Sequence, residues 1–234
     1  TRDDIMIYLI DKGVESEQSF KIMESVRKGK GLTPDYEKVM KEHDVPDWYL
    51  WSCKKIKYMF PKAHAVAYVM MGIRIAWFKI HEPLAYYAAF FTIRATAFDY
   101  GLMCQGKAAI DNHIKAYKAN PNLSKKEQDT LRDMRIVQEM YARGFEFMPI
   151  DIYRAKARNF QIIDGKLMPP FSSIDGMGEK AAEAVEEAAK DGPYLSKDDF
   201  RNRTKASKTV VDYMADLGLL GDLPESNQLS LFDL

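Results

Sequence analysis

The sequence has few of the residues that build disulfide frameworks and metal centres. Its two cysteines, Cys53 and Cys104, are too few for a disulfide scaffold or a four-cysteine zinc site, and neither has an identifiable base partner. The four histidines show no metal-ligand spacing, and no carboxylate pair indicates a two-metal centre. From the residues alone we expect a reduced, cytoplasmic protein that offers binding surfaces and no active site.

Long hydrophobic runs and an excess of one charge are also absent. The most apolar stretch, residues 65–78, has 14 residues and contains Arg74, whereas a membrane-spanning helix needs about 20. We therefore expect a buried core helix there, and no membrane partner. The 34 basic residues equal the 34 acidic ones, which excludes a histone-like polycation. Nucleic-acid binding is not excluded, because it depends on where the charges lie.

The pattern indicates a mainly α fold. A hydrophobic content of 47% excludes a disordered chain, and the start at Thr1 without a signal peptide suggests a piece of a longer protein. Helices are predicted over most of residues 1–143, the first capped by Asp3 or Asp4. A further helix is expected to run unbroken over 100–119. Short strands are expected at 145–147, 159–163 and 166–168, with Asp164-Gly165 as the hairpin turn, before helices resume over 174–220.

A Gly-x-Gly turn precedes a helix at residues 174–185. Gly176 and Gly178 permit a tight turn, the free N–H groups at the helix start can bind an anion, and Lys180 adds charge at the rim. This pattern is typical of a helix-hairpin-helix motif, which grips a DNA phosphate without reading bases. The alternative is an ordinary corner between two helices that binds no ligand.

A degenerate copy of this pattern follows at residues 204–211. Ala206 and Ser207 stand where the glycines were, and Lys205 and Lys208 supply charge. Two such hairpins can pair as a unit and contact both strands of one duplex. We therefore predict duplex DNA binding in this part of the chain.

Two basic runs offer further phosphate contacts. Residues 54–62 hold four lysines and no acid, interleaved with Tyr58 and Phe60, and His64 follows at once. The second run lies on a glycine turn and comprises Arg27, Lys28 and Lys30. The alternative for both is a solvated basic face, with the aromatic side chains in the core.

The last seven residues form an apolar tail that is typical of a peptide bound by a partner. The anchors are expected to be Leu229, Leu231 and Phe232, with Gln228 orienting the peptide by hydrogen bonds. A tail docked on its own domain, or a disordered end, are the alternatives.

Three segments in order resemble one protein family. Residues 57–68 and 20–31 closely resemble the fingers region of bacterial DNA polymerase III alpha subunits. Residues 20–31 and the terminal residues 228–232 look like the PolC type, the replicative polymerase of low-GC Gram-positive bacteria. The resemblance covers the whole chain.

The resemblance implies a polymerase fragment with three parts. Residues 1–140 would be fingers, residues 141–222 a small α+β duplex-binding domain with helix-hairpin-helix motifs near 174–190 and 204–218, and residues 223–234 a tail that binds the sliding clamp. Template-directed nucleotidyl transfer would use Mg²⁺ held by palm aspartates upstream of Thr1, so this chain would contain no catalytic residue, bind no metal and be inactive alone. The implied partners are primer-template DNA, the dNTP, the clamp, the upstream palm, thumb, PHP and exonuclease regions, and other replisome subunits.

The resemblance also implies roles for individual residues. Tyr58 would pack on the nascent base pair, and Lys62 and His64 would contact the triphosphate, with Lys55 and Arg2 as further nucleotide-binding candidates. The DNA-binding candidates are Gly176, Gly178, Lys180, Lys205, Ser207, Lys208, Arg27, Lys28 and Lys30. Two other interpretations stay open: a non-catalytic, clamp-tethered DNA-binding accessory or repair module, and a helical interaction protein that binds no nucleic acid.

Overall fold

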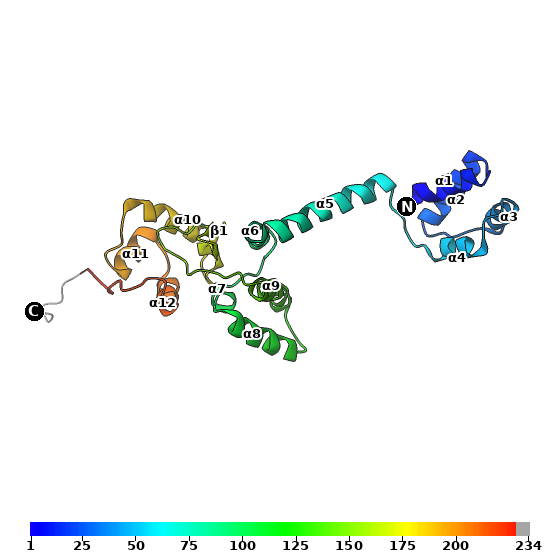
Figure 1. The fold of residues 1–234 in the computed structure, drawn as a ribbon. Coiled ribbons are helices and arrows are strands. Elements are labelled where there is room, and N and C mark those ends of the chain that lie inside the picture. Colours follow the sequence, from blue (N-terminus) through cyan, green and yellow to red (C-terminus); the bar gives the residue numbers. More distant parts are fainter. Residues whose placement is uncertain (228–234) are drawn as a thin grey trace, which may run out of the picture. The chain divides into compact units, whose positions relative to one another are not determined.

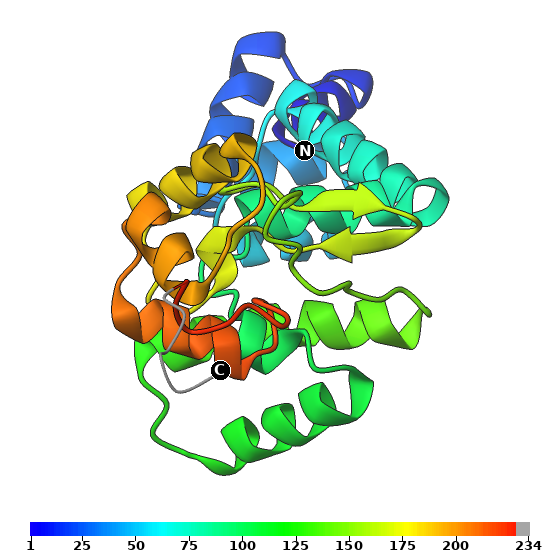
Figure 2. The same cartoon turned by 90° about the vertical axis from the view of Figure 1, so that its left-hand side faces the viewer.

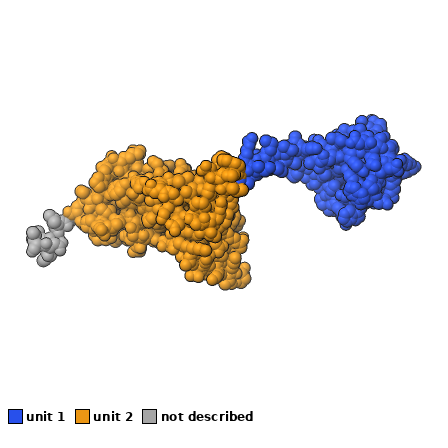
Figure 3. All heavy atoms as spheres, in the orientation of Figure 1, with its two compact units in different colours: residues 1–76 blue, residues 77–234 orange. Residues whose placement is uncertain are grey.

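The computed structural model describes residues 1–227 of the chain (Figure 1). It is mainly helical with one two-stranded sheet, which confirms the predicted fold class. The chain divides into two compact units, Thr1–Ala76 and Trp77–Leu234 (Figure 3).

The first unit is built from short helices around a small apolar core. Its helices are α1 (Arg2–Asp11), α2 (Ser16–Arg27), α3 (Pro34–Glu42), α4 (Asp47–Lys55) and the beginning of α5 (Lys62–His81). The core centres on Leu9, Ile22, Val26 and Met40, which are fully buried. Because α1 and α2 pack closely, their apolar faces cover each other.

The beginning of α1 differs from the prediction. Thr1, and not Asp3 or Asp4, is the N-cap, and Asp4 sits three residues on and completes a capping box with it. Asp3 instead accepts a hydrogen bond from the backbone N–H of Lys62 at 2.6 Å. The two carboxylates therefore fix the chain around the start of α5.

Helix α5 was expected to be buried, and this expectation is wrong for the described residues. None of its residues is buried, and Tyr68 and Ile80 are each 67% exposed. Its apolar residues lie on all sides of the helix, so only several neighbours together would cover it. Across residues 1–227, no helix has the length and hydropathy that a membrane crossing requires.

The second unit contains the remaining helices and the sheet (Figure 2). The α-helices are α6 (Pro83–Ile93), α7 (Tyr100–Met103), α8 (Lys107–Ala119), α9 (Lys125–Ala142), α10 (Glu179–Ala188), α11 (Lys197–Thr204) and α12 (Lys208–Asp216). Two 3₁₀ turns, η1 (Phe171–Ser173) and η2 (Ala189–Asp191), lie on either side of α10. The predicted continuous helix over 100–119 is wrong, because Gly106 adopts a φ of +90° and separates α7 from α8.

The small sheet agrees with its sequence signal at the turn. Strands β1 (Gln161–Ile163) and β2 (Lys166–Met168) are antiparallel, with Ile162 opposite Leu167. Asp164 and Gly165 both have positive φ, as the tight hairpin turn requires. The strand predicted at 145–147 is reduced to a single bridge from Phe147 to Leu167, because the chain there runs past the fully buried Leu167 as a loop.

Two apolar clusters hold the second unit together. One contains Tyr87, Phe91 and Met134 and continues to Phe160 and Leu167. The other lies among α10, α11 and α12 and includes Phe171, Val185, Phe200 and Met214, each of which is fully buried. Because the first cluster continues across residue 140, packing sets no boundary at that position, and the functional boundaries at 140 and 222 remain predictions.

Candidate nucleic-acid interfaces

The first hairpin turn has the conformation that its glycines suggest. Gly176 adopts a φ of +77°, Met177 points into the core at 5% exposure, and Gly178 is extended and caps α10. Lys180 on the first turn of α10 is exposed. The first N–H groups of α10 therefore follow an exposed glycine, as in an anion-binding helix start.

The second turn repeats this backbone without glycine. Lys205 adopts a left-handed φ of +56°, Ala206 is 5% exposed, and Ser207 is extended and caps α12. The prediction is therefore confirmed for Ser207, which corresponds to Gly178, and wrong for Ala206, since Lys205 and not Ala206 corresponds to Gly176. Ala206 resembles glycine only in the small size of its side chain. What the two turns share is a backbone pattern of three residues: one with left-handed φ, one that is buried, and one that caps the following helix.

The two hairpins pack against each other as one element. A Cβ atom added to Gly176 would lie 3.5 Å from Cγ2 of Val210, a residue of α12. Ala182 and Val185 of α10 share their core with Val210 and Met214 of α12. Both turns are therefore held in a fixed relation, as duplex binding by a tandem motif needs.

The charges around the hairpins are unevenly balanced. The acids of α10 form ion pairs: Glu183 with Arg158 at 2.7 Å, Glu186 with Lys156 at 3.1 Å, and Glu187 with Lys190. In contrast, the turn lysines are exposed and form no ion pair within the described chain; they are Lys180, Lys205 and Lys208. A chain of zero net charge thus presents unpaired positive charge at the second turn, whereas at the first turn Lys180 stands near the exposed carboxylate of Asp175.

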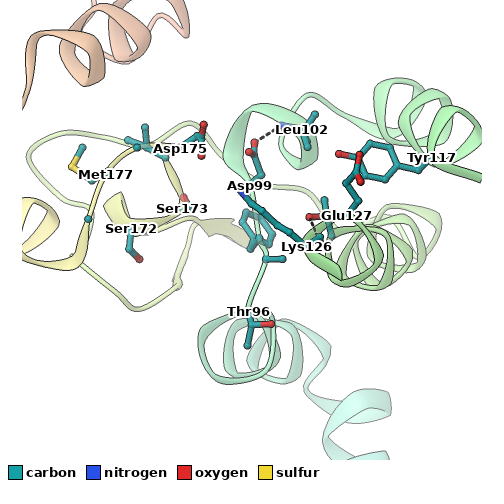
Figure 4. A pocket seen from close by; sticks show the side chains of 16 residues that line it. Thr96, Asp99, Leu102, Tyr117, Lys126, Glu127, Ser172, Ser173, Asp175 and Met177 are labelled. Carbon is teal, nitrogen blue, oxygen red and sulfur yellow. Dashed lines mark hydrogen bonds between the residues drawn. The ribbon is translucent and has the colours of Figure 1, made fainter. Parts of the chain in front are cut away.

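A hollow of about 580 Å³ lies beside the first turn (Figure 4). Its lining joins Asp175 and Gly176 of the turn to Asp99 and Lys126 from the first half of the unit. Burial raises the pKa of Asp99, whose carboxylate accepts a hydrogen bond from the N–H of Leu102 at 2.9 Å. The nearby carboxylates disfavour a phosphate inside the hollow, so we expect DNA phosphate at the exposed side of the turn.

In the first unit, the structure brings the two basic runs together. Gly29, with a φ of +73°, lies so close to Lys57 that an added Cβ would overlap the Lys57 carbonyl oxygen. The N–H of Met59 donates a hydrogen bond to the carbonyl of Arg27 at 3.3 Å. The turn that carries Arg27, Lys28 and Lys30 is therefore packed on the segment that carries Tyr58.

One carboxylate gathers several of these cations. The Arg27 guanidinium donates to Glu24 at 2.6 Å, Lys28 lies 3.0 Å from the same carboxylate, and Arg2 lies at 4.0 Å. Hydrogen bonds from Arg27 and then Lys28 lower the pKa of Glu24 to about 2. Three cations around one anion leave a net positive surface, and the exposed Lys30 adds to it without an ion pair among residues 1–227.

The predicted triphosphate ligands lie close together, but one of them is paired. The ammonium of Lys62 lies 3.1 Å from Asp4, and its pairing contributes, after the N-terminal amine and Thr1, to lowering the pKa of Asp4. The backbone N–H of Arg2 donates to the Phe60 carbonyl at 3.2 Å, so α1 lies against this segment. Lys55, at the end of α4, lies 5.4 Å from the ring centre of Trp51.

Four rings form a continuous series that we call the aromatic ladder: Tyr58, Phe60, His64 and Tyr68. Successive ring centres are 5.0, 4.7 and 4.6 Å apart. Tyr58 is 58% exposed and Phe60 51%, so the alternative that these aromatics sit in the core is wrong. Sequence reasoning missed Tyr68 as a site residue, although its spacing of four residues from His64 places both on one face of α5.

The remaining predictions concern the clamp-binding tail and metal binding. The clamp-binding residues Gln228, Leu229, Leu231 and Phe232 lie outside the described residues. The chain just before them is docked on α11, where the N–H of Lys197 donates to the carbonyl of Pro224 at 2.9 Å. Among residues 1–227, no three His, Cys, Asp or Glu side chains gather in a way that fits a metal ion.

Comparison with known proteins gives two results. A family model described as a helix-hairpin-helix motif matches residues 144–229. The chain is 51% identical over 232 residues, 99% of its length, to the PolC-type DNA polymerase III of Caldanaerobacter subterraneus subsp. tengcongensis. It is also 51% identical over all 234 residues to the PolC-type enzymes of Staphylococcus epidermidis and Staphylococcus aureus.

These relatives are much longer than this chain. The chain spans 17% of the length of the Caldanaerobacter enzyme and 16% of the two staphylococcal enzymes. Over its whole length, the chain is thus similar to one part of a PolC-type DNA polymerase III, which confirms the resemblance found in the sequence.

Proposed function

We propose that this chain is the C-terminal part of a PolC-type replicative DNA polymerase, in which it positions the incoming nucleotide and grips the product duplex. The observation that carries the proposal is the pair of hairpin turns with one shared backbone conformation, packed together in a chain that is similar over its full length to such polymerases. Nucleotidyl transfer itself, and the magnesium ions it uses, belong in this proposal to residues outside this chain.

The hairpins are proposed to bind the duplex through its phosphates. The first N–H groups of α10 can bind a phosphate, as can those of α12 apart from that of Val210, which donates to Ser207, and Lys180, Lys205 and Lys208 add charge there. Contacts of this kind fix the position of the duplex and carry no sequence information. A replicative polymerase needs this property, because it must hold every product sequence.

The segment around the aromatic ladder is proposed to hold the nucleotide. Tyr58 packs on the nascent base pair, while Lys62, His64 and Arg2 face the triphosphate, with Lys55 at its edge. A lysine there acts as a point charge that compensates negative charge growing in the transition state. Because Lys62 is paired with Asp4, a triphosphate must compete with this carboxylate for the ammonium.

The remaining proposed partners rest on the family resemblance of the sequence. Gln228, Leu229, Leu231 and Phe232 bind the sliding clamp, and the palm, thumb, PHP and exonuclease regions lie elsewhere in the same polymerase. The enzyme acts in the cytoplasm at the nucleoid-associated replisome. A non-catalytic clamp-tethered module is the second candidate; it gives the basic and aromatic segment of the first unit no role, so the polymerase assignment is favoured.

Duplex binding by the 234-residue chain tests the proposal. We expect its affinity for blunt duplex DNA to fall steeply with salt, with little sequence preference. Lys180→Ala and Lys208→Ala should each reduce the slope of log affinity against log salt by roughly 0.9. The matched control is Lys190→Ala, whose side chain is paired with Glu187 and should leave the slope nearly unchanged. A sequence-specific footprint, or slopes that do not change in the first two variants, would contradict the proposal.

A further inference from the structure

The aromatic ladder is exposed and contains more rings than the proposed nucleotide site requires. A single nascent base pair offers one face to one ring, but here four rings are in contact in series. Tyr68, the last of them, is 67% exposed, and its one ring contact within residues 1–227 is with His64. The ladder therefore continues beyond Tyr58 and ends on a free aromatic surface.

Basic residues outnumber acidic ones around the ladder, and the two acids that reach it, Asp3 and Asp4, are bound by Lys62 and the N-terminal amine. Between Asp47 and Glu82 the sequence has six basic residues and no acidic one. Lys57, next to Tyr58, is exposed and forms no ion pair with any described residue. Lys30 reaches the same region, because its glycine turn is packed against Lys57. The surface is thus complementary to a polyanion that also carries flat apolar groups.

We infer that the aromatic ladder binds single-stranded nucleic acid, with bases stacked on its rings and phosphates held by the flanking lysines. Exposed aromatic rings beside cations are the means by which proteins hold unpaired strands. Duplex DNA does not fit this surface, since its base faces are stacked inside the helix. In a polymerase the ligand is the unpaired template strand; that identification rests on the proposed function, whereas the binding itself does not.

The geometry divides the rings into inner and outer positions. Phe60, His64 and Tyr68 follow at intervals of four residues, which places His64 between the other two. With a ring on each side, His64 offers its edge, and its nitrogen atoms are free to contact phosphate. Tyr68 has a ring neighbour on one side only, so it is the residue that we assign to stacking on a base.

The test measures binding of a fluorescent oligothymidylate to the 234-residue chain by anisotropy. Tyr68→Ala should weaken binding by about 5- to 150-fold, the range that stacking of one base contributes. Tyr68→Phe keeps the ring and should bind like the wild type. Trp48→Ala removes an aromatic residue that is 66% exposed but outside the ladder, and it should also bind like the wild type. Because Tyr68 and Trp48 are exposed, circular dichroism should show all variants folded.

A second probe separates stacking from charge. An oligonucleotide with the same phosphates but no bases should bind more weakly, and Tyr68→Ala should not weaken its binding further. The inference is overturned if Tyr68→Ala binds oligothymidylate as the wild type does, if Trp48→Ala loses as much, or if the baseless strand shows the same loss. Blunt-duplex binding measured on the same variants does not depend on base stacking, so failure of the ladder and failure of the proposed function give different results.

Discussion

Replacement of Lys205 by glycine should make the protein more stable and weaken its grip on DNA. Lys205 is held at a φ of +56°, in the left-handed region, where a residue with a Cβ is strained by about 1–2 kcal/mol. Glycine removes this strain but costs about 0.4–1 kcal/mol through the greater freedom of the unfolded chain. The expected net effect of Lys205→Gly is therefore a stabilisation between roughly 0 and 1.6 kcal/mol, about 0.8 kcal/mol at the midpoints of the two ranges.

The same substitution removes one of the unpaired charges at the second turn. If the Lys205 ammonium contacts a phosphate, the slope of log affinity against log salt for blunt duplex should fall by roughly 0.9. Most substitutions that weaken a binding surface through damage to the fold also lower stability. A variant that is more stable but binds DNA more weakly would therefore indicate that the strained conformation of Lys205 is retained because its charge contributes to binding.

Urea unfolding followed by circular dichroism measures the first effect, and anisotropy titrations at several salt concentrations measure the second. Asp44→Gly is the matched control, because Asp44 has nearly the same φ, +53°, and is exposed in the first unit. It should gain less stability than Lys205→Gly, because aspartate tolerates the left-handed region better than lysine, and it should not reduce the salt slope. A less stable Lys205→Gly protein would refute the strain argument, and an unchanged slope would refute the phosphate contact.

Three further outcomes are expected. Gly29→Ala should destabilise the first unit by about 3 kcal/mol, because its Cβ overlaps the Lys57 carbonyl. Gly31→Ala, with a φ of +72° and open space around it, should cost only about 1 kcal/mol in the same urea experiment, and equal losses would count against the overlap. In the full polymerase, Lys62→Ala should lower kcat/KM for the nucleotide at least roughly tenfold in steady-state primer extension, while unchanged kcat and KM would remove Lys62 from the nucleotide site. Deletion of residues 228–234 should abolish clamp-dependent processive synthesis and spare basal extension, whereas equal losses of both would indicate a structural tail.

Local signals in the sequence predicted local structure well. The Asp164-Gly165 turn was predictable because a two-residue hairpin needs positive φ at both positions, and this residue pair tolerates it. The start of α9 was equally predictable, since Ser124 and Glu127 form a capping box. Both conformations depend on residues within one turn of each other, so no knowledge of the rest of the chain was needed.

Features that depend on distant contacts could not be predicted. In the second hairpin, the counterpart of Gly176 was misassigned to Ala206 because the left-handed residue is Lys205, and lysine has no intrinsic preference for that conformation. The joining of the two basic runs depends on close approach of Gly29 to Lys57, residues far apart in the sequence. The exposure of α5 was not predicted because an apolar sequence shows that a helix has apolar side chains, but does not show which other segment, if any, packs against them.

The balance of charge explains how a neutral chain can present two cationic surfaces. In the hairpin region, Glu183 and Glu186 have basic partners on the loop that follows α9, so the turn lysines keep their charge. In the first unit, a single carboxylate, Glu24, serves three cations, and the segment of the ladder has no acid at all. The net charge of zero does not reflect this uneven distribution of paired and unpaired residues.

Neutralising the carboxylate that pairs with these cations should therefore change binding more than an equal change of net charge elsewhere in the chain. Glu24→Gln frees Arg27 and Lys28 and should strengthen oligothymidylate binding, whereas Glu42→Gln, which adds the same charge on α3, should change it much less. Anisotropy titrations at one salt concentration compare the two variants directly. Equal effects would show that total charge, and not this local arrangement, governs binding.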